Sequence, residues 1–210
     1  MIYLYTGTPG AGKSYHMAET IYYNVRINKP VVCNFDVNRN VWKNGGKTFY
    51  YVPNNILTPA NLAKISQVYF EDHPFSEGAI KLYIDECQII FNARSWNDRN
   101  RSDWVKFFTQ HRKLGYDIYL IAQFDSMIDK QIRSLIEYEV KHRKLNNVGW
   151  VGKLASVLLM GHPCFVAVHY WYPQKQRLSA DFRIGRKKLY RLYDTNLVFE
   201  GQDLITVSGG

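Results

Sequence analysis

The sequence GTPGAGKS, residues 7–14, directly follows the apolar hexapeptide MIYLYT at the start of the chain. It matches the pattern G-x-x-x-x-G-K-[ST] in full, with Gly7, Gly12, Lys13 and Ser14 at the fixed positions. Such a loop needs glycines because backbone N–H groups turn inward around phosphate oxygens, where a Cβ would block the approach. We interpret the stretch as a phosphate-binding loop; the alternative is a Gly/Pro-rich turn that binds nothing.

The residues on both sides of the loop support this interpretation. Residues 2–5 are typical of a buried strand and residues 13–28 of a helix, so bound phosphate would lie at the positive end of a helix dipole. Lys13 would reach the β- and γ-phosphates of ATP, and the Ser14 hydroxyl would ligate Mg²⁺. The expected nucleotide-binding residues are Gly7, Thr8, Pro9, Gly10, Ala11, Gly12, Lys13, Ser14 and His16.

A second motif, KLYIDECQIIF (81–91), places two acids directly after a short run of β-favouring residues. In phosphate-loop proteins an acid at the end of such a strand orients Mg²⁺, so Asp85 is the expected metal ligand beside Ser14. Glu86 follows it and can take a proton from attacking water, a pairing that separates ATP hydrolases from most kinases. The alternative is an acidic pair on the surface at a strand end.

A third candidate, Gln123, ends the segment DIYLIAQ (117–123). A polar residue at the tip of the strand beside the first one would point at the γ-phosphate and position the attacking water. The alternative is an amide that caps a loop.

Strands and helices alternate through residues 1–123, which predicts an α/β fold with a mainly parallel sheet and helices on both faces. Thr58 and Pro59 are typical of a helix start, and Ser102 is expected to cap a helix that Gly115 ends. The expected strands after the first are 30–35, 47–53 (short and peripheral), 79–86 and 117–123, and the expected helices after the first are 59–69 and 102–114.

From about Tyr138 the sequence becomes β-rich, and we expect added strands that extend the sheet edge. These segments are 138–144, two strands within 154–172, 177–184 and 188–194. The stretch 154–172 is apolar enough to raise a membrane span, but Gly161-His162-Pro163 interrupts it, which favours two buried strands around a turn.

Composition indicates a globular protein, one α/β domain with or without an extension. The chain has 210 residues, 46% of them hydrophobic, and a mean hydropathy of −0.32. The net charge of +9 is uneven: residues 1–100 carry 10 basic and 8 acidic side chains, and residues 101–210 carry 17 and 10. A basic second half suggests a phosphate-rich partner or a membrane surface, with a solvated basic surface as the alternative. Three cysteines without C-x-x-C spacing are expected to be free core thiols.

The order and spacing of several blocks, over about residues 1–196, resemble the zonula occludens toxin family of filamentous-phage assembly ATPases. The blocks are GTPGAGKS, IDECQ, FFTQHRKLGYDIYLIAQ, IDKQIRSL and LYRLYDT. The segment HR-x-x-G-x-D, leading into a strand that ends in Gln, is the most specific of them.

The resemblance implies a P-loop NTPase of the additional-strand, catalytic-glutamate type, a three-layer sandwich with a β-rich C-terminal extension. It implies an ATP- and Mg²⁺-dependent energy source for extruding a single-stranded DNA phage through the host envelope, with phage coat or assembly proteins as partners. Residues 1–196 would form the ATPase domain. The tail 197–210 is expected to lead toward a membrane span that this chain lacks, which would hold the domain on the cytoplasmic side of the host inner membrane.

Motors of this class act as rings, such as hexamers, and complete each site with an arginine from the neighbouring subunit. Arg112 is the first candidate, because it lies just before the strand that ends at Gln123; the competing candidates are Arg94, Arg99, Arg101 and Arg133. The expected catalytic set is therefore Lys13, Glu86, Gln123 and Arg112.

Three basic segments suit single-stranded DNA, and the same segments would also suit anionic lipid or phage coat protein. They are 94–101, 141–144 and 183–188. Two other functions remain open at this stage. One is a small-molecule or nucleotide kinase, against which Glu86 counts, and the other is a toxin or scaffold that binds ATP without turning it over.

Overall fold

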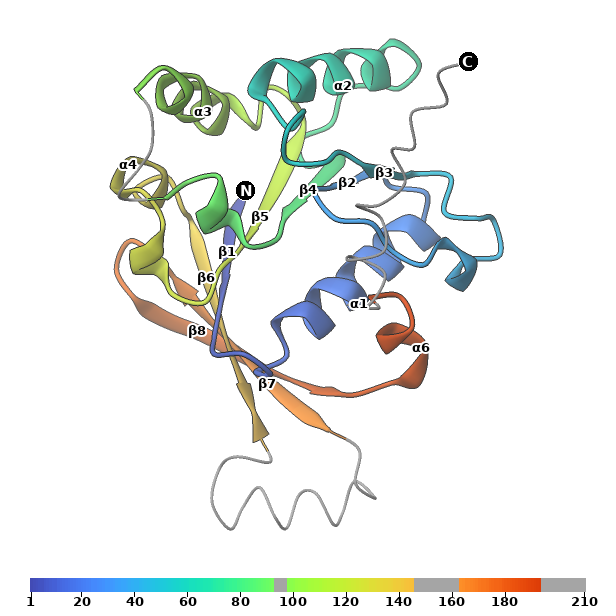
Figure 1. The fold of residues 1–210 in the computed structure, drawn as a ribbon, viewed down its shortest axis with the longest axis vertical. Helices are drawn as coiled ribbons and strands as arrows, with labels where there is room; N and C mark the ends of the chain where they lie inside the picture. The colour runs from blue at the N-terminus through green and yellow to red at the C-terminus, as the bar shows by residue number, and fades with distance from the viewer. Residues whose placement is uncertain (93–97, 146–162, 194–210) are drawn as a thin grey trace, which may run out of the picture.

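The computed structural model describes residues 1–92, 98–145 and 163–193, with the side chains of residues 98–100 left out. Figure 1 shows one twisted sheet with helices on both sides. The strands are β1 (Ile2–Thr6), β2 (Val31–Cys33), β3 (Phe49–Tyr51), β4 (Ile80–Ile84), β5 (Tyr116–Ile121), β6 (Tyr138–Lys144), β7 (Cys164–Trp171) and β8 (Gln176–Ile184). The helices are α1 (Lys13–Arg26), α2 (Pro59–Glu71), α3 (Asp98–Gln110), α4 (Lys130–Arg133) and α6 (Lys187–Tyr190).

The strand order is β3-β2-β4-β5-β1-β6-β7-β8, parallel from β3 to β6 and antiparallel for β7 and β8. Strand β5 lies between β1, which leads into the phosphate loop, and β4, which leads into the acid pair. This is the additional strand expected from the resemblance. Because the carboxyl ends of parallel strands meet at one edge, residues that follow β1, β4 and β5 gather there.

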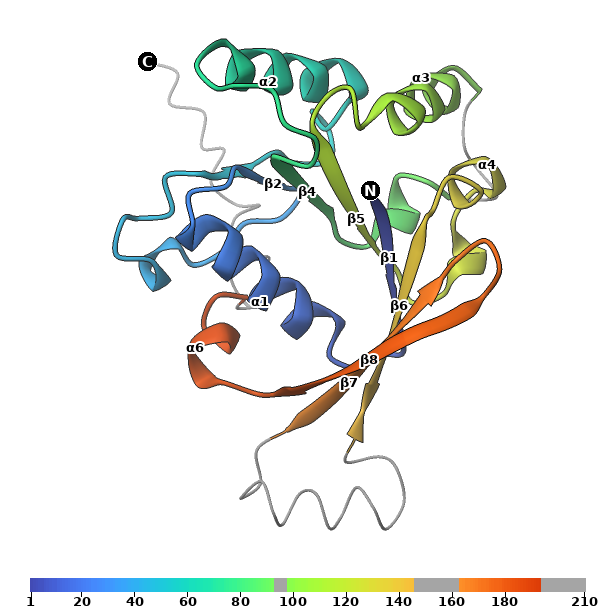
Figure 2. The same ribbon diagram turned by 180° about the vertical axis from the view of Figure 1, so that it is seen from behind.

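Two apolar layers hold the helices against the sheet, which confirms the expected three-layer sandwich. One layer joins α2, α3 and α4 to β4, β5 and β1, with Leu62, Phe108, Ile132 and Leu120 among its buried residues. The other joins α1 to the opposite face through Met17, Ile21 and Val25. Seen from behind, α6 lies beside α1 on this second face (Figure 2).

Stacked tyrosine rings cross the sheet on the α1 side. Tyr119 of β5 stacks on Tyr3 of β1 at 4.9 Å and on Tyr83 of β4 at 4.5 Å between ring centroids. Tyr138 of β6 stacks on the other side of Tyr3 at 5.4 Å. The rings belong to directly paired residues on parallel strands, so this row ties together the three strands whose carboxyl ends carry the candidate site.

The sequence prediction of strands is largely confirmed. Each expected strand in residues 1–123 forms, and Thr58 caps α2 by accepting a hydrogen bond from the Asn61 N–H, with Pro59 at the first helical position. Two antiparallel strands, β7 and β8, extend the sheet. The first half of the apolar stretch 154–172 lies outside the described residues. Within the described residues, no helix has the length and apolarity that crossing a membrane requires.

Two expectations were wrong. The segment 188–194 was expected to be a strand, but its described part forms the end of α6 and a turn. Leu189 and Leu192 are both buried, and a spacing of three places them on one helical face, whereas a strand would have pointed them to opposite faces. Helix α3 begins at Asp98 rather than after a Ser102 cap.

All three cysteines are free and buried, as the sequence analysis expected. Burial raises the pKa of the Cys33 and Cys87 thiols well above the ordinary value, so these thiols stay protonated. They act as small apolar core residues in the structure.

The tyrosine row generates a stability prediction. Replacing Tyr119 by Ala removes the ring that contacts two neighbouring strands and leaves a gap, which we expect to lower the free energy of unfolding by about 3 kcal/mol. Tyr119→Phe keeps the stacked ring and is the matched control, with an expected loss below about 1 kcal/mol. Urea denaturation of both variants measures the difference, and equal losses would show that the stack does not stabilise the sheet.

Candidate functional site

The phosphate loop leaves β1 at Thr6 and enters α1 at Lys13. Three of its residues adopt positive φ angles, with Gly7 at 146°, Gly10 at 74° and Gly12 at 100°. L-amino acids with a Cβ rarely occupy this region, so the backbone path itself requires glycine at these positions. The Gly7 N–H donates to the Gln123 carbonyl at 3.2 Å, which fixes the start of the loop to the end of β5.

Strands β6 and β7 press directly on this loop. A Cβ on Gly7 would lie 2.6 Å from the His142 carbonyl oxygen, and one on Gly12 would lie 2.4 Å from a ring carbon of Phe165. Backbone atoms cannot move aside cheaply, and Phe165 is itself buried against Tyr15. The two glycines are therefore required by packing as well as by backbone conformation.

The amino end of α1 carries no capping group of its own. Its N-cap residue is Gly12, no side-chain hydrogen bond caps the helix, and no acid lies in its first turn. A helix start leaves several N–H groups without intrahelical partners, and its dipole adds a partial positive charge. Such an end, preceded by a glycine loop, is suited to an anion such as phosphate.

Lys13 lies folded across the loop. Its Nζ donates to the Gly7 carbonyl at 2.6 Å and to the Thr8 carbonyl at 3.3 Å. Burial lowers the pKa of this amine, and the negative charges of Asp85 and Glu86 partly oppose that effect. Because β1, β5 and β4 pair in parallel, their carboxyl ends meet at one edge of the sheet, which places the loop and the two acids at one site.

Asp85 is held by hydrogen bonds on its backbone and on both carboxylate oxygens. Its N–H donates to Asn34 Oδ1 at 2.7 Å, and its carbonyl accepts from Asn34 Nδ2 at 2.9 Å. Oδ1 accepts from the Glu86 N–H at 2.9 Å, and Oδ2 accepts from the Tyr193 hydroxyl at 2.8 Å. Burial raises the pKa of this carboxyl, while its hydrogen bonds and Lys13 oppose the shift.

The oxygen atoms of Ser14 and Asp85 fit a magnesium site. No ion pair joins Asp85 to a lysine or arginine among the residues that the structure describes, so its carboxylate charge lacks a direct cationic partner. Mg²⁺ prefers oxygen ligands and usually completes its shell with phosphates and water. In the part of the chain that the structure describes, no group of three or more His, Cys, Asp or Glu side chains could hold a metal ion by itself. Bound phosphate would therefore supply the remaining ligands.

Glu86 occupies a left-handed backbone conformation, with φ 47° and ψ 43°. This region is uncommon for a residue with a side chain and is frequent at functional positions. Its side chain is exposed and accepts a hydrogen bond from the Gln88 amide. The turn therefore leaves the Glu86 side chain exposed to solvent at the edge where Lys13 and Asp85 lie. A residue that takes a proton from water needs such exposure.

Gln123 follows β5 and borders an open pocket of about 540 Å³ beside the loop. The pocket is lined by three groups of residues: Thr6, Gly7 and Thr8 of the loop; Gln123, Phe124 and Asp125 after β5; and Glu139, Lys141, His142, Arg143 and Lys144 of β6. Gln123 thus lies at the expected edge. The basic segment 141–144 forms one wall of this pocket.

His16 is turned away from the loop and into the core. It is 3% exposed, and its Nδ1 lies 2.8 Å from Nε2 of His142, which is also buried. Its Nε2 lies 3.4 Å from the Tyr5 hydroxyl, and His142 Nδ1 lies 3.2 Å from the Thr6 carbonyl. The side chain of His16 therefore joins α1 to β1 and β6, and contact with a nucleotide through it stays an untested prediction.

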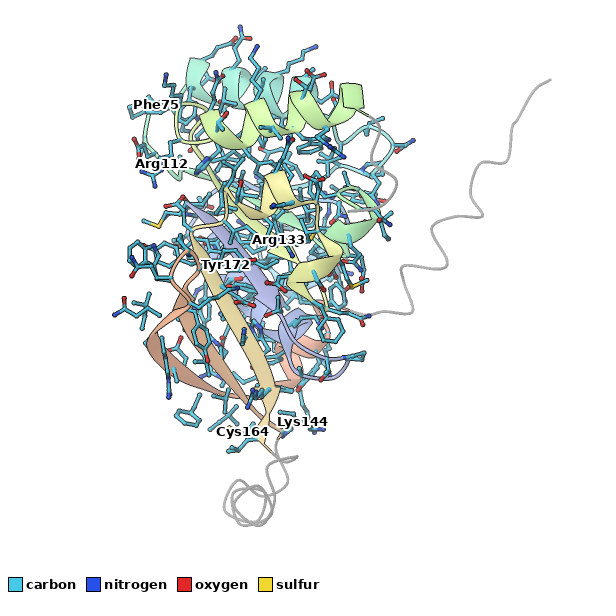
Figure 3. All side chains as sticks on the ribbon, turned by 90° about the vertical axis from the view of Figure 1, so that its left-hand side faces the viewer. Phe75, Arg112, Arg133, Lys144, Cys164 and Tyr172 are labelled. Atoms are coloured by element: carbon cyan, nitrogen blue, oxygen red, sulfur yellow. The ribbon has the colours of Figure 1, made fainter. Side chains whose placement is uncertain are left out.

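Arg112 lies at the amino ends of the parallel strands, whereas the loop lies at their carboxyl ends. It precedes β5, and its Nη2 contacts Glu137 Oε2 at 2.6 Å just before β6. Figure 3 shows Arg112 near one end of β6 and Lys144, which borders the loop pocket, near the other. Within its own chain Arg112 does not reach the site, so a catalytic role would need a neighbouring subunit. Of the competing arginines, Arg101 pairs with Asp129 at 3.4 Å, and Arg94 and Arg99 have no described side chains.

Sequence reasoning missed four residues of this site. Asn34 and Tyr193 hold Asp85, and His142 and Phe165 pack on the loop. Asn34 directly follows β2, the strand that pairs with β4. A polar residue at such a strand end is a signal that could have identified it. The other three lie more than 100 positions away from their partners, and no local pattern marks them.

The chain is similar in sequence to a known protein family and to phage proteins. A family model described as zonular occludens toxin (Zot) matches residues 1–179. The Gene 1 protein of Escherichia phage If1 is 30% identical over 210 residues, which covers 94% of this chain and 59% of the relative. The Gene 1 protein of Enterobacteria phage I2-2 is 36% identical over 126 residues, 56% of this chain and 34% of the relative. The chain thus spans roughly one third to three fifths of these relatives.

Solved structures share the fold. The N-terminal domain of zonular occludens toxin from Neisseria meningitidis has a TM-score of 0.52 at 22% identity, covering 92% of this chain and 98% of that one. The genome packaging NTPase B204 from Sulfolobus turreted icosahedral virus 2, in complex with ATP-gammaS, has a TM-score of 0.51 at 13% identity, covering 88% and 96%. At these identities the likeness establishes the P-loop NTPase fold and nothing further about this chain.

The buried histidine pair generates a prediction about pH. Burial is the main reason that the pKa of His142 falls to about 4 and that of His16 falls well below 6.5, so both rings are neutral at pH 7. Between about pH 6.5 and about pH 4 the unfolded chain binds more protons than the folded one, so this contribution to stability is lost as pH falls through that window.

We expect the thermal unfolding midpoint of the wild type to be lower at about pH 5.5 than at about pH 7.5, because histidine in the unfolded chain titrates between these two values. His142→Gln keeps a hydrogen-bonding side chain but cannot titrate, and we expect it to show a smaller drop. Comparing the two proteins cancels contributions from other groups, such as Asp85. Identical pH profiles would contradict the assignment of the effect to this pair.

Proposed function

The chain belongs to the zonular occludens toxin family, and on that premise we propose that it is an ATP-hydrolysing motor domain that powers assembly and extrusion of a filamentous single-stranded DNA phage. The observation that carries this proposal is the uncapped amino end of α1, with its glycine loop, at the same sheet edge as Asp85 and Glu86. A phosphate-binding loop alone would suit many functions, whereas the adjoining acid pair suits attack by water.

In the proposed site the loop and the start of α1 bind the phosphates, and Lys13 leaves its two carbonyl partners to contact the β- and γ-phosphates. Ser14 and Asp85 would hold Mg²⁺, which when bound neutralises charge on the phosphate oxygens. Because Lys13 Nζ donates to the Gly7 and Thr8 carbonyls, the amine lies inside the loop, next to the proposed phosphate positions.

The proposed reaction is hydrolysis of the terminal phosphoanhydride bond. Glu86 accepts a proton from water as the water oxygen forms a bond to the γ-phosphorus, and the bond from that phosphorus to the β-phosphate oxygen breaks. The products are ADP and inorganic phosphate. Gln123, at the end of the strand between the loop and the acids, would orient this water and sense the γ-phosphate.

The proposed function also implies partners for the chain and a location in the host cell. We propose a ring of identical subunits at the host inner membrane, acting with phage coat or assembly proteins. The pocket wall formed by Lys141, Arg143 and Lys144 supports contact with single-stranded DNA, because closely spaced cations beside a nucleotide site would attract a phosphate backbone.

Glu86→Gln tests the hydrolytic role. The amide keeps the shape of the side chain but cannot accept a proton, so ATP should still bind while turnover falls by about 10²- to 10⁴-fold. Phosphate release and equilibrium binding of an ATP analogue measure the two properties separately. Gln88→Ala is the matched control, because it removes the amide that donates to the Glu86 side chain without removing the carboxylate. Loss of binding in Glu86→Gln would instead indicate a structural or metal-binding role.

A mixing experiment tests the role of Arg112 across a subunit boundary. Lys13→Ala and Arg112→Ala should each be inactive, since an arginine acting in trans contributes roughly 10³- to 10⁵-fold in rate. In mixed rings some interfaces pair an intact loop with an intact arginine, so part of the activity should return. Lys113→Ala removes the neighbouring exposed cation and should remain active alone. If mixing restores nothing although the subunits co-assemble, Arg112 is not the trans residue, and Arg133 is tested next.

A further inference from the structure

After β8 the chain runs along the outer side of α1. Its last described residue, Tyr193, contacts Asp85 of the proposed metal site. We call residues 185–193 the C-terminal strap; it contains α6, which lies beside α1 (Figure 2). The sequence analysis expected residues 188–194 to be a strand, and the proposed hydrolysis mechanism does not use the strap.

Tyrosines of α1 fix the strap along its length. The Tyr15 hydroxyl donates to the Ile184 carbonyl at 2.9 Å and accepts from the Arg186 N–H at 3.1 Å. Further along, Lys188 Nζ donates to the Tyr22 hydroxyl at 2.7 Å. Because α1 also begins with Lys13 and Ser14, the strap is attached to the helix that forms half of the nucleotide site.

The end of the strap packs into the α1 layer. Leu192 is fully buried in the α1 layer, and its carbonyl accepts from the Asn38 N–H at 3.0 Å. The Tyr193 ring packs edge-on against Phe35 at 5.5 Å. These contacts leave the Tyr193 hydroxyl pointing at Asp85, to which it donates at 2.8 Å.

The hydroxyl of Tyr193 is well suited to orient this carboxylate. The Tyr193 hydroxyl is the donor in its hydrogen bond to Asp85 Oδ2, because a carboxylate oxygen can only accept. With Oδ1 held by the Glu86 N–H and Oδ2 by Tyr193, rotation of the carboxylate is restricted at both oxygens. Each oxygen keeps a further lone pair, so the carboxylate can still accept from a metal-bound water.

We propose that Tyr193 is a positioning residue that fixes the Asp85 carboxylate for Mg²⁺ and thereby ties the C-terminal strap to the metal site. The inference rests on the proposed function, because it takes Asp85 as the metal carboxylate. Groups that orient a metal ligand from outside the coordination shell typically change metal affinity when they are removed. Movement of the strap would then alter metal binding through Asp85.

The test is binding of a fluorescent, non-hydrolysable ATP analogue, measured at increasing Mg²⁺ concentration. Tyr193→Phe removes only the hydroxyl and keeps the ring on Phe35, which circular dichroism and thermal melting verify. We expect its metal-free affinity for the analogue to equal that of the wild type, while the Mg²⁺ concentration at half effect rises about 10-fold. Tyr23→Phe is the matched control, because its hydroxyl also contacts the strap, at Arg186, but lies away from Asp85.

The outcomes separate this inference from the proposed function. An unchanged Mg²⁺ requirement in Tyr193→Phe, beside a wild type that responds to Mg²⁺, overturns the role of Tyr193 and leaves the proposed function intact. A lower Mg²⁺ requirement overturns positioning as well, because it would mean that the hydroxyl competes with the metal. Equal rises in Tyr193→Phe and Tyr23→Phe assign the effect to loosening of the strap, which also overturns it. A wild type that does not bind the analogue at all contradicts the proposed function itself, and the inference with it.

Discussion

A Cβ has no room at the two ends of the phosphate loop. At Gly7 the obstacle is the His142 carbonyl of β6, and at Gly12 it is the Phe165 ring of β7. The β-rich part of the chain is therefore a wall of the candidate site as well as an extension of the sheet. The same strands carry His142, whose ring bonds to His16 on the first turns of α1. The loop is thus enclosed from behind, and its open side faces the carboxyl edge of the parallel strands.

That edge is assembled from elements whose order in the sheet differs from their order in the chain. Insertion of β5 between β1 and β4 places Gln123 between the loop and the acid pair. Asp85 is held by Asn34 from β2 on one side and by Tyr193 from the strap on the other. The candidate chemistry therefore depends on four strand ends and on the C-terminal strap, whose Tyr193 directly contacts the proposed metal ligand Asp85.

The sequence predicted those parts of the site that lie within continuous motifs. The glycine loop, the acids after a buried strand and the Thr58-Pro59 helix start are local, because neighbouring residues in the chain determine their conformation. The helices on both faces of the sheet followed from the alternation of strands and helices, whereas the additional strand came from the resemblance. Residues 188–194 were misread as a strand, although Lys-Leu-Tyr-Arg-Leu-Tyr repeats every three residues and Leu189 and Leu192 are buried with that helical spacing. The contacts of Tyr193, His142 and Phe165 depend on tertiary packing, which one sequence does not reveal.

The central claim is that this edge of the sheet hydrolyses ATP, and phosphate release by the purified chain tests it most directly. The measurement compares wild type with Lys13→Ala, with and without Mg²⁺, over a wide range of protein concentration. The account predicts Mg²⁺-dependent release that falls by roughly 100-fold or more in Lys13→Ala, because the cation facing the β- and γ-phosphates is lost. Release that is unchanged in Lys13→Ala, or absent from a folded wild type at every concentration, would contradict it.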